Sequence, residues 1–273
     1  MVVPYFPERR ESIERMKIVF LGATQFSREL LLHLLNNQIK PDRLFTIPQE
    51  FNISYSDTKV KNYNFANLPE IAAQHNIPCY EVESTTGKRI TDYYDDLVAL
   101  QPDVILVMGW YYMVPKKIRD IAKHGTWGIH ASLLPKYAGG APLVWAIING
   151  EKETGVSLFK LDEGVDDGDI IAQQVIPIAF EDSIKEVYAK ATEASKEILL
   201  NALQHIETIK FIPQDKSKIE VWPQRKPEDG QIDLSWPAER IYNFIRAQAS
   251  PYPGAFIKTD DGNKIIVEKA RLG

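Results

Sequence analysis

Short apolar runs alternate with segments of helical periodicity from residue 17 to residue 209 of this chain. Residues 17–22 (KIVFLG) end in glycine and precede leucines at helical spacing. Residues 103–108 (DVILVM) are apolar apart from the first, as in a strand buried on both faces of a parallel sheet. Strands that alternate with helices build a doubly wound, mostly parallel sheet. We therefore predict an α/β fold for residues 1–210.

The same patterns predict the other elements of this domain. Further strands are expected at 42–47, 78–82, 126–130, 155–161 and 170–178, the last two as a pair. Helices are expected at 26–37, 68–76, 91–100, 116–123, 141–149 and 183–209. Residues 48–67 are polar and aromatic without periodicity, which predicts a long surface loop with a functional role.

The composition and the pattern of predicted elements change after residue 210. Six prolines fall between residues 213 and 253, and 238–247 is the one short helix expected there. The tetrapeptide DDGN at 260–263 separates two short apolar runs and predicts a hairpin. We predict a second domain, residues 211–273, as a small and mostly β appendage.

Charge and cysteine content exclude several classes of function. The chain has 32 basic and 37 acidic residues, a net charge of −5, which disfavours a broad nucleic-acid footprint. Its single cysteine, Cys79, excludes an internal disulfide framework, and no histidine spacing indicates a metal site. No run of about 18 apolar residues predicts a membrane span, and residues 1–15 lack an apolar leader. We expect a cytoplasmic protein without metal, membrane or nucleic-acid partners.

Two segments carry residues suited to chemistry. His130 ends a predicted strand, where ligands bind in open α/β sheets, and an imidazole there suits proton transfer. Five of the eight residues from 162 to 169 are acidic. A calcium loop would need a DxDxDG spacing that is absent, whereas a carboxylate could orient the histidine. A histidine at this position can also be purely structural.

Taken together, HASLLPKYAGGAPLVWAIING from residue 130 and LDEGVDDGDI from residue 161 are similar to the catalytic core of the folate-dependent formyltransferases. This family includes glycinamide ribonucleotide transformylase, methionyl-tRNA formyltransferase and the sugar N-formyltransferases. The family's catalytic histidine and aspartate are 36 residues apart, which implies His130 and Asp166 here. Where the family has an asparagine that holds the formyl oxygen, this chain has Gly128. We expect a backbone N–H, Ser132 or Asn149 to replace that donor.

The resemblance implies a reaction and a co-substrate. A deprotonated amine would attack the formyl carbon of 10-formyltetrahydrofolate, without a metal. His130 would stabilise the resulting oxyanion or move the amine proton, and Asp166 would orient the imidazole. By the same resemblance, two segments bind the folate, with these residues: Trp110, Tyr111, Tyr112, Met113, Leu161, Asp162, Gly164, Val165 and Asp167.

Three branches of the family differ in the acceptor amine. The chain ends at Gly273 and is acidic, whereas the tRNA enzyme has a full C-terminal barrel and a basic surface. The glycinamide ribonucleotide enzyme lacks a segment like 225–255. The chain is therefore most similar to the sugar N-formyltransferases, which implies as acceptor a UDP- or dTDP-linked amino sugar such as a 4-amino-4,6-dideoxyhexose, for surface-polysaccharide or nonulosonic acid biosynthesis. A tRNA formyltransferase, a 10-formyltetrahydrofolate hydrolase and a non-catalytic relative remain alternatives.

Cations and aromatic faces suit a nucleotide diphosphate. The candidate acceptor contacts are Lys59, Lys61, Tyr63, Ser132, Lys136, Tyr137, Arg246 and Tyr252. The hairpin at 255–268 has edges that a partner could cover, so we also expect a homodimer.

Overall fold

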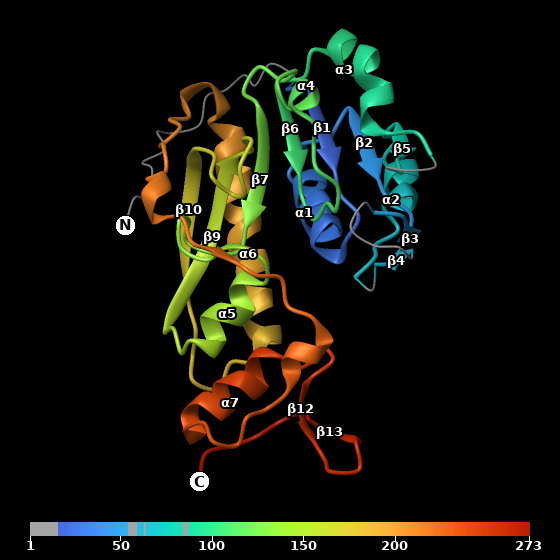
Figure 1. Cartoon of the computed structure of the whole chain (residues 1–273). Helices are drawn as coiled ribbons and strands as arrows, with labels where there is room; N and C mark the ends of the chain where they lie inside the picture. Colours follow the sequence, from blue (N-terminus) through green and yellow to red (C-terminus); the bar gives the residue numbers. More distant parts are fainter. Residues whose placement is uncertain (1–15, 54–58, 63, 84–86) are drawn as a thin grey trace.

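A seven-stranded sheet forms the centre of the computed structural model, which describes residues 16–53, 59–62, 64–83 and 87–273 (Figure 1). The strand order is β10-β9-β7-β6-β1-β2-β5. Neighbouring strands from β7 to β5 are parallel, and β9 is antiparallel to both β7 and β10. The strands are β1 (Ile18–Leu21), β2 (Arg43–Thr46), β5 (Cys79–Glu81), β6 (Val104–Val107), β7 (Thr126–His130), β9 (Glu153–Lys160) and β10 (Ile170–Pro177). This topology confirms the predicted fold class.

Helices cover both faces of the sheet, which explains why β1 and β6 at its centre are apolar throughout. Ile18 and Phe20 of β1 belong to one core, and the alternate residues Val19 and Leu21 belong to the other. The first core includes side chains of α1 (Gln25–Asn36), α2 (Leu68–Gln74), α5 (Pro142–Ile148) and α6 (Ile184–Gln204). The second includes side chains of α3 (Tyr94–Leu100), α4 (Lys116–Arg119) and the 3₁₀ helix η1 (Ile90–Tyr93).

Local capping sets the start of the two long helices. Thr24 caps α1 by accepting a hydrogen bond from the backbone N–H of Ser27. Ser183 caps α6 in the same way, and Glu186 accepts from the backbone N–H of Ser183 in return. The predicted helix at 183–209 is divided, because α6 ends at Gln204 and η2 (Ile206–Thr208) follows. No helix of the described part of the chain is long and apolar enough to span a membrane.

After α6 the chain returns along the core before it forms the appendage. Ile212 pairs with Ile170 through two backbone hydrogen bonds, and η3 (Lys216–Lys218) follows. β11 (Val221–Trp222) then pairs with β8 (Ala138–Gly139), which lies in the loop after β7. The domain boundary near residue 210 stays a prediction. The predicted loop at 48–67 contains a small ladder of β3 (Glu50–Phe51) and β4 (Val60–Lys61).

The appendage has a small core of its own. Ile232, Phe244, Ile245 and Ala255 pack together and against Ile148 of the main domain. Its elements are η4 (Pro227–Gly230), α7 (Ala238–Ala247) and a hairpin of β12 (Ala255–Lys258) and β13 (Lys264–Val267). The predicted helix and hairpin are both present, and Figure 1 shows them beyond α5, at the far end of the molecule from α3 and α4.

Candidate active site

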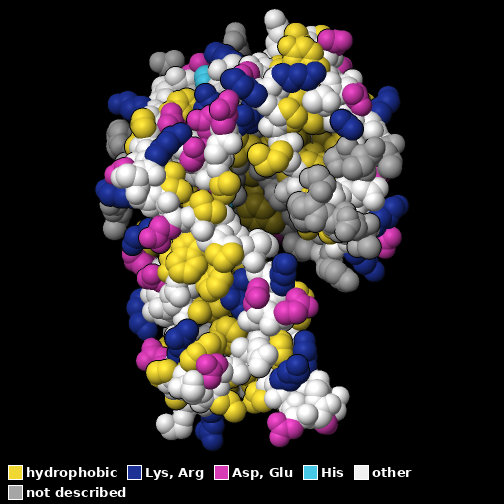
Figure 2. Space-filling view, in the orientation of Figure 1, with side chains coloured by type: hydrophobic (Ala, Val, Ile, Leu, Met, Phe, Trp, Pro, Cys, Tyr) yellow, Lys and Arg dark blue, Asp and Glu magenta, His cyan; other side chains and the backbone are white. Residues whose placement is uncertain are grey.

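The site lies where the parallel strands end. The ends of β7, β6 and β1 face the gap that separates the sheet from the appendage (Figure 1). In the space-filling view this face is hollowed, and hydrophobic side chains line the hollow (Figure 2). His130 is the last residue of β7, so its position follows from the sheet topology.

The two residues predicted as a catalytic pair lie together. His130 Nδ1 is 3.4 Å from Asp166 Oδ2, and both side chains are largely buried, with 10% and 21% exposure. The same Asp166 oxygen accepts a hydrogen bond of 2.8 Å from the backbone N–H of Gly139. The carboxylate therefore connects the end of β7 with the loop that follows it.

The second ring nitrogen of His130 shows where the imidazole proton sits. Nε2 is 2.7 Å from the carbonyl oxygen of Tyr137. A carbonyl can only accept a hydrogen bond, so Nε2 is the donor and Nδ1 faces the carboxylate of Asp166. A proton gained at Nδ1 would be held directly against that carboxylate, which is a suitable place for a proton taken from a substrate amine.

The loop that carries Asp166 is held by a residue that sequence analysis missed. Asp166 has a left-handed backbone, with φ of +51°. The side-chain amide of buried Gln214 donates two hydrogen bonds of 2.7 Å, to the carbonyls of Asp166 and Gly168. Gln214 follows the strand-like pairing of Ile212 with Ile170, so the segment after α6 fixes the loop.

Close packing also explains two glycines of the site. A Cβ on Gly168 would lie 1.7 Å from the carbonyl oxygen of Lys160, so only glycine lets the acidic loop lie this close to β9. Gly139 has φ of +89°, and a Cβ there would lie 2.6 Å from the carbonyl oxygen of Trp222. Glycine at 139 thus allows β11 to pair with β8 beside the catalytic pair.

The position of the family's asparagine is filled by a hydrocarbon side chain. A Cβ on Gly128 would lie 2.9 Å from Cδ2 of Leu161, so Leu161 packs directly over this glycine. The hydroxyl of Ser132 is buried and already donates to the carbonyl of Lys136. The amide of exposed Asn149 uses one of its two N–H groups for the hydroxyl of Tyr137. Of the three expected donors, the second N–H of Asn149 and a backbone N–H remain.

The first predicted folate segment forms an aromatic wall. Tyr111 and Tyr112 pack against Phe51, at 5.0 and 5.5 Å between ring centres, and Trp110 packs edge-on against Tyr112. The hydroxyl of Tyr111 donates to buried Asn62, a further residue that sequence analysis missed. Met113 is 80% exposed, although it is large and apolar. This wall leaves apolar surface open to a ligand.

The second predicted folate segment is more polar. Asp162, Gly164 and Val165 are exposed, and Asp167 is ion-paired with Lys216 at 2.9 Å. That ion pair accounts for one carboxylate oxygen of Asp167. The other, Oδ1, is buried and has no hydrogen-bond partner among the described residues, as is also true of Nε1 of Trp110. One buried acceptor and one buried donor are thus unsatisfied in the two segments, as expected where a polar ring system binds.

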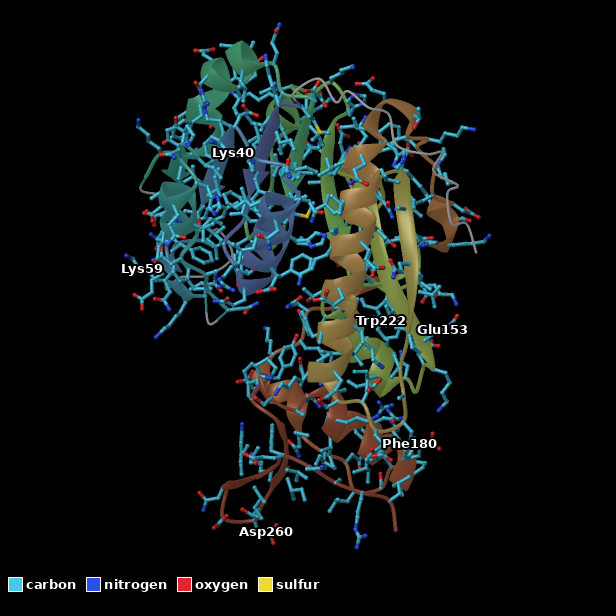
Figure 3. All side chains as sticks on the ribbon, turned by 180° about the vertical axis from the view of Figure 1, so that it is seen from behind. Lys40, Lys59, Glu153, Phe180, Trp222 and Asp260 are labelled. Atoms are coloured by element: carbon cyan, nitrogen blue, oxygen red, sulfur yellow. The ribbon has the colours of Figure 1, made fainter. Side chains whose placement is uncertain are left out.

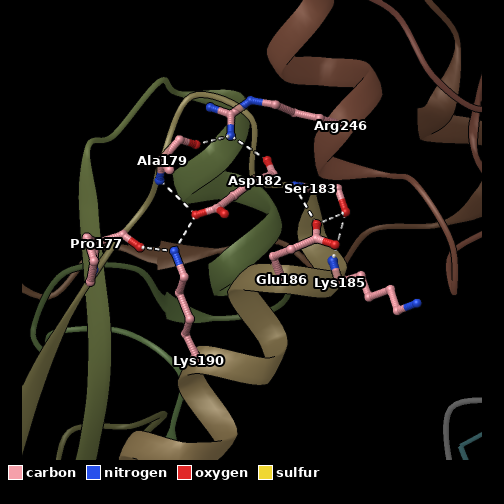
Figure 4. Close-up of polar contacts among 8 residues, drawn as sticks. All are labelled: Pro177, Ala179, Asp182, Ser183, Lys185, Glu186, Lys190 and Arg246. Carbon is pink, nitrogen blue, oxygen red and sulfur yellow. Dashed lines mark hydrogen bonds and ion pairs between the residues drawn. The ribbon is translucent and has the colours of Figure 1, made fainter.

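Two of the predicted acceptor contacts have structural roles instead. Ser132 is fully buried and its hydroxyl is used within its own loop. Arg246 is 6% exposed, and its guanidinium donates to the side chain of Asn243. It also donates to the carbonyls of Ala179 and Asp182 (Figure 4). Both side chains are thus engaged within the protein, and their assignment as acceptor contacts stays a prediction.

The remaining acceptor candidates are dispersed. Lys136 and Tyr252 are exposed, as are Lys59 and Lys61, and Figure 3 shows Lys59 at the outer edge of the domain. Tyr63 lies outside the described residues.

Among the acceptor candidates, Tyr137 makes a direct hydrogen bond with His130. Its carbonyl accepts the His130 hydrogen bond, and its hydroxyl donates to Glu151 at 2.8 Å. Burial raises the pKa of Tyr137 to about 12, so the phenol stays protonated. Its ring packs against Trp222, which also packs against Trp145. Trp222 therefore anchors the site to the segment that leads into the appendage, a role that the sequence analysis did not predict.

Comparison with known proteins decides the family. The family model described as "Formyl transferase" matches residues 16–203, and "Formyl transferase, C-terminal domain" matches residues 225–273. The chain belongs to the formyl transferase family. It is 33% identical over 252 residues to methionyl-tRNA formyltransferase of Citrifermentans bemidjiense, which covers 90% of this chain and 75% of that protein.

Solved structures show the same fold at lower identity. A 4-N formyltransferase from Francisella tularensis superposes with a TM-score of 0.69 at 20% identity, over 94% of this chain and 100% of that one. The N-formyltransferase of Helicobacter canadensis, in complex with folinic acid and dTDP-3-aminofucose, superposes with a TM-score of 0.63 at 22% identity. That match covers 85% of this formyltransferase and 80% of the Helicobacter chain.

This formyltransferase uses formyltetrahydrofolate as the co-substrate, in line with its family. The wall formed by residues 110–113 and the acidic loop at 161–167 fit a pteridine, because they offer exposed apolar surface and unsatisfied polar atoms. Within the described ranges, no cluster of three histidine, cysteine or acidic side chains could hold a metal ion.

Proposed function

We propose that this formyltransferase transfers the formyl group of 10-formyltetrahydrofolate to the amine of a nucleotide-linked amino-deoxy sugar. The observation that carries the catalytic part is the contact of 3.4 Å between His130 Nδ1 and Asp166 Oδ2 at the end of β7. A histidine beside a carboxylate can take up a proton and hold it as a paired imidazolium.

Each residue of the site has a different role in the proposed reaction. The folate supplies an activated formyl group. His130 receives the proton of the acceptor amine at Nδ1 as the amine bonds to the formyl carbon, and Asp166 stabilises the cation that forms. The bond from the formyl carbon to N10 then breaks, and the proton passes from His130 to N10 of the departing tetrahydrofolate. Because Leu161 covers Gly128, either the second amide N–H of Asn149 or a backbone N–H takes the place of the family's side-chain amide as hydrogen-bond donor to the formyl oxygen. Exposed apolar groups such as Met113 and Val165 cover the bound folate and keep water from the formyl group.

Charge supports a small acceptor over tRNA. A net charge of −5 disfavours a long polyanion, whereas a nucleotide diphosphate requires only a few local cations. The Helicobacter enzyme was crystallised with dTDP-3-aminofucose, and its fold is shared by this chain. The second candidate is formylation of methionyl-tRNA, which the identity of 33% to the Citrifermentans enzyme favours.

Two further features belong to the proposal. The hairpin of β12 and β13 leaves Ile265 and Ile266 exposed by 56% and 47%, which supports a homodimer that covers them. The single cysteine is compatible with a reducing cytoplasm. Light scattering of the purified protein tests the homodimer, and fractionation of the native cell tests the cytoplasmic location.

A direct assay separates the two acceptors. The purified protein is incubated with 10-formyltetrahydrofolate and either a panel of UDP-, dTDP- and GDP-linked amino sugars or methionyl-tRNA, and mass spectrometry detects the N-formyl product. We expect a formylated sugar, no formylated tRNA, and loss of activity in His130→Ala. The control His75→Ala changes an exposed histidine and should leave the rate unchanged. Formylation of tRNA alone, or formate release without any acceptor, would overturn the proposal.

A further inference from the structure

A cavity of about 160 Å³ lies between the main domain and the appendage. Ala141 lines it from the main domain, and Arg225, Lys226, Gln248 and Tyr252 line it from the other side. Ala141 is two residues from Gly139, whose N–H donates to Asp166. Two residues of chain span at most about 7 Å. The cavity therefore begins a short distance from the catalytic pair.

The guanidinium of Arg225 is held in a fixed position at this cavity. It stacks 4.7 Å from the ring centre of Trp145 and 5.5 Å from that of Phe244. Trp145 is itself fixed, because its indole N–H donates to the carbonyl of Pro223 at 3.0 Å. Rigid aromatic stacking of this kind orients a guanidinium and leaves its edge available for hydrogen bonds.

Arg225 forms no ion pair within the described part of the protein, although the nearby carboxylate of Asp229 partly stabilises its charge. Its Nη2 donates to two uncharged oxygens, the carbonyl of Asp229 at 2.7 Å and Oε1 of Gln248 at 2.9 Å. No carboxylate of the described residues forms an ion pair with it. Burial lowers the pKa of Arg225, which reflects the cost of withdrawing this cation from water. Such a cost is offset when an anion binds.

Arg246, in the same region, differs from Arg225 in the partners of its guanidinium. Its Nε and Nη1 both donate to oxygens of the protein, two of them in the turn before α6 (Figure 4). Arg246 does not line the cavity, whereas Arg225 does. The arginine available to a ligand is therefore the one that sequence analysis did not select.

We infer that the cavity at Arg225 binds the diphosphate of the acceptor substrate, with the guanidinium as its principal contact. This assignment rests on the proposed function, since it names how that acceptor is held. Because Nη2 of Arg225 already donates to two protein oxygens, Nε and Nη1 are the donors that remain for phosphate oxygens. Exposed Lys226 adds a second positive charge, and Tyr252 offers an aromatic face for the base.

Kinetics of Arg225→Gln test the assignment in the active enzyme. We expect the KM for the nucleotide sugar to rise about 10- to 100-fold, with kcat and the KM for 10-formyltetrahydrofolate unchanged. Arg225→Lys keeps the charge and should recover part of the affinity. The control is Arg240→Gln, because Arg240 also stacks on an indole ring, that of Trp236 at 4.4 Å, but does not line the cavity. An unchanged KM in folded Arg225→Gln would overturn the inference.

Calorimetry with dTDP, UDP and inorganic pyrophosphate tests the site without catalysis. We expect these anions to bind the wild type and Arg240→Gln, and to bind Arg225→Gln at least tenfold more weakly. Equal binding to all three proteins, or no binding to the wild type, would overturn the inference. If the anions bind through Arg225 but no sugar is formylated, the cavity assignment stands and the proposed function fails. If Arg225→Gln instead raises only the KM for methionyl-tRNA, the phosphate comes from RNA and the assignment is wrong.

Discussion

The substitution Gln214→Glu separates the positioning of the catalytic loop from its chemistry. Gln214 donates hydrogen bonds of 2.7 Å to the carbonyls of Asp166 and Gly168. A carboxylate of the same shape has no proton to donate, so both carbonyls lose their donor and face a negative charge. A buried acceptor without its donor costs about 1–3 kcal/mol, so the two together cost about 2–6 kcal/mol.

The loop can relieve this cost by moving Asp166 away from His130. If about 2–4 kcal/mol of this cost is added to the activation free energy, kcat falls about 30- to 1000-fold, because each 1.36 kcal/mol changes the rate tenfold. Burial and the two carbonyl oxygens raise the pKa of the introduced carboxyl group. Once protonated, that group donates one hydrogen bond again. The activity of Gln214→Glu relative to wild type should therefore rise as the pH falls.

The assay is the pH profile of formyl transfer for wild type, Gln214→Glu and the control Gln174→Glu. Gln174 lies on β10 and donates to Glu197 at the surface, so the same chemical change there should leave kcat unchanged. A melting curve for each protein establishes that it is folded. Wild-type kcat in Gln214→Glu, or a deficit that is identical at every pH, would refute the positioning role.

Three further outcomes follow from the structure. Asp166→Asn keeps the shape of the side chain but removes the charge beside His130, so kcat should fall about 10²- to 10⁴-fold. The affinity for folinic acid, measured by calorimetry, should change little. An unchanged kcat would contradict the catalytic role of the pair. Arg246→Leu removes the three hydrogen bonds of a buried guanidinium, so the free energy of unfolding, measured with denaturant, should fall by about 3–5 kcal/mol. A raised KM for the acceptor without loss of stability would contradict the structural role of Arg246. Burial raises the pKa of Cys79 to about 11, so the thiol stays protonated at pH 8. From the thiolate fractions, iodoacetamide should react roughly 240-fold more slowly than with a free cysteine of pKa about 8.5, and a rate equal to that of free cysteine would contradict this.

The catalytic pair shows what could and could not be predicted from the spacing of residues in the sequence. His130 could be placed at the end of a strand, because the short segment 126–130 is followed by a loop rich in glycine and proline. Asp166 was placed by resemblance alone. Residue spacing does not reveal that Asp166 has a left-handed backbone, or that Gln214 holds its loop. Gln214 is remote in sequence from both catalytic residues, and no local pattern marks a glutamine whose partners are backbone carbonyls.

The two arginines show the same limit for the acceptor side. Arg225 and Arg246 carry the same charge in neighbouring segments, and nothing in the sequence distinguishes a guanidinium that binds a ligand from one that binds the protein. The difference arises because Arg246 faces the turn before α6, where carbonyl oxygens take its donors, and Arg225 faces a cavity. The burial of Ser132 likewise depends on how its loop packs.

The order of apolar runs and helical periods was enough to define the α/β sheet, since burial on both faces favours apolar residues along central strands such as β1 and β6. The motif around His130 was enough to indicate the chemistry. The partners of each polar side chain depended on the folded chain, because hydrogen bonds of about 3 Å join residues far apart in the sequence, and their geometry is set by packing. The same packing placed Leu161 over Gly128 and left Arg225 beside the catalytic loop without an ion-pair partner among the described residues.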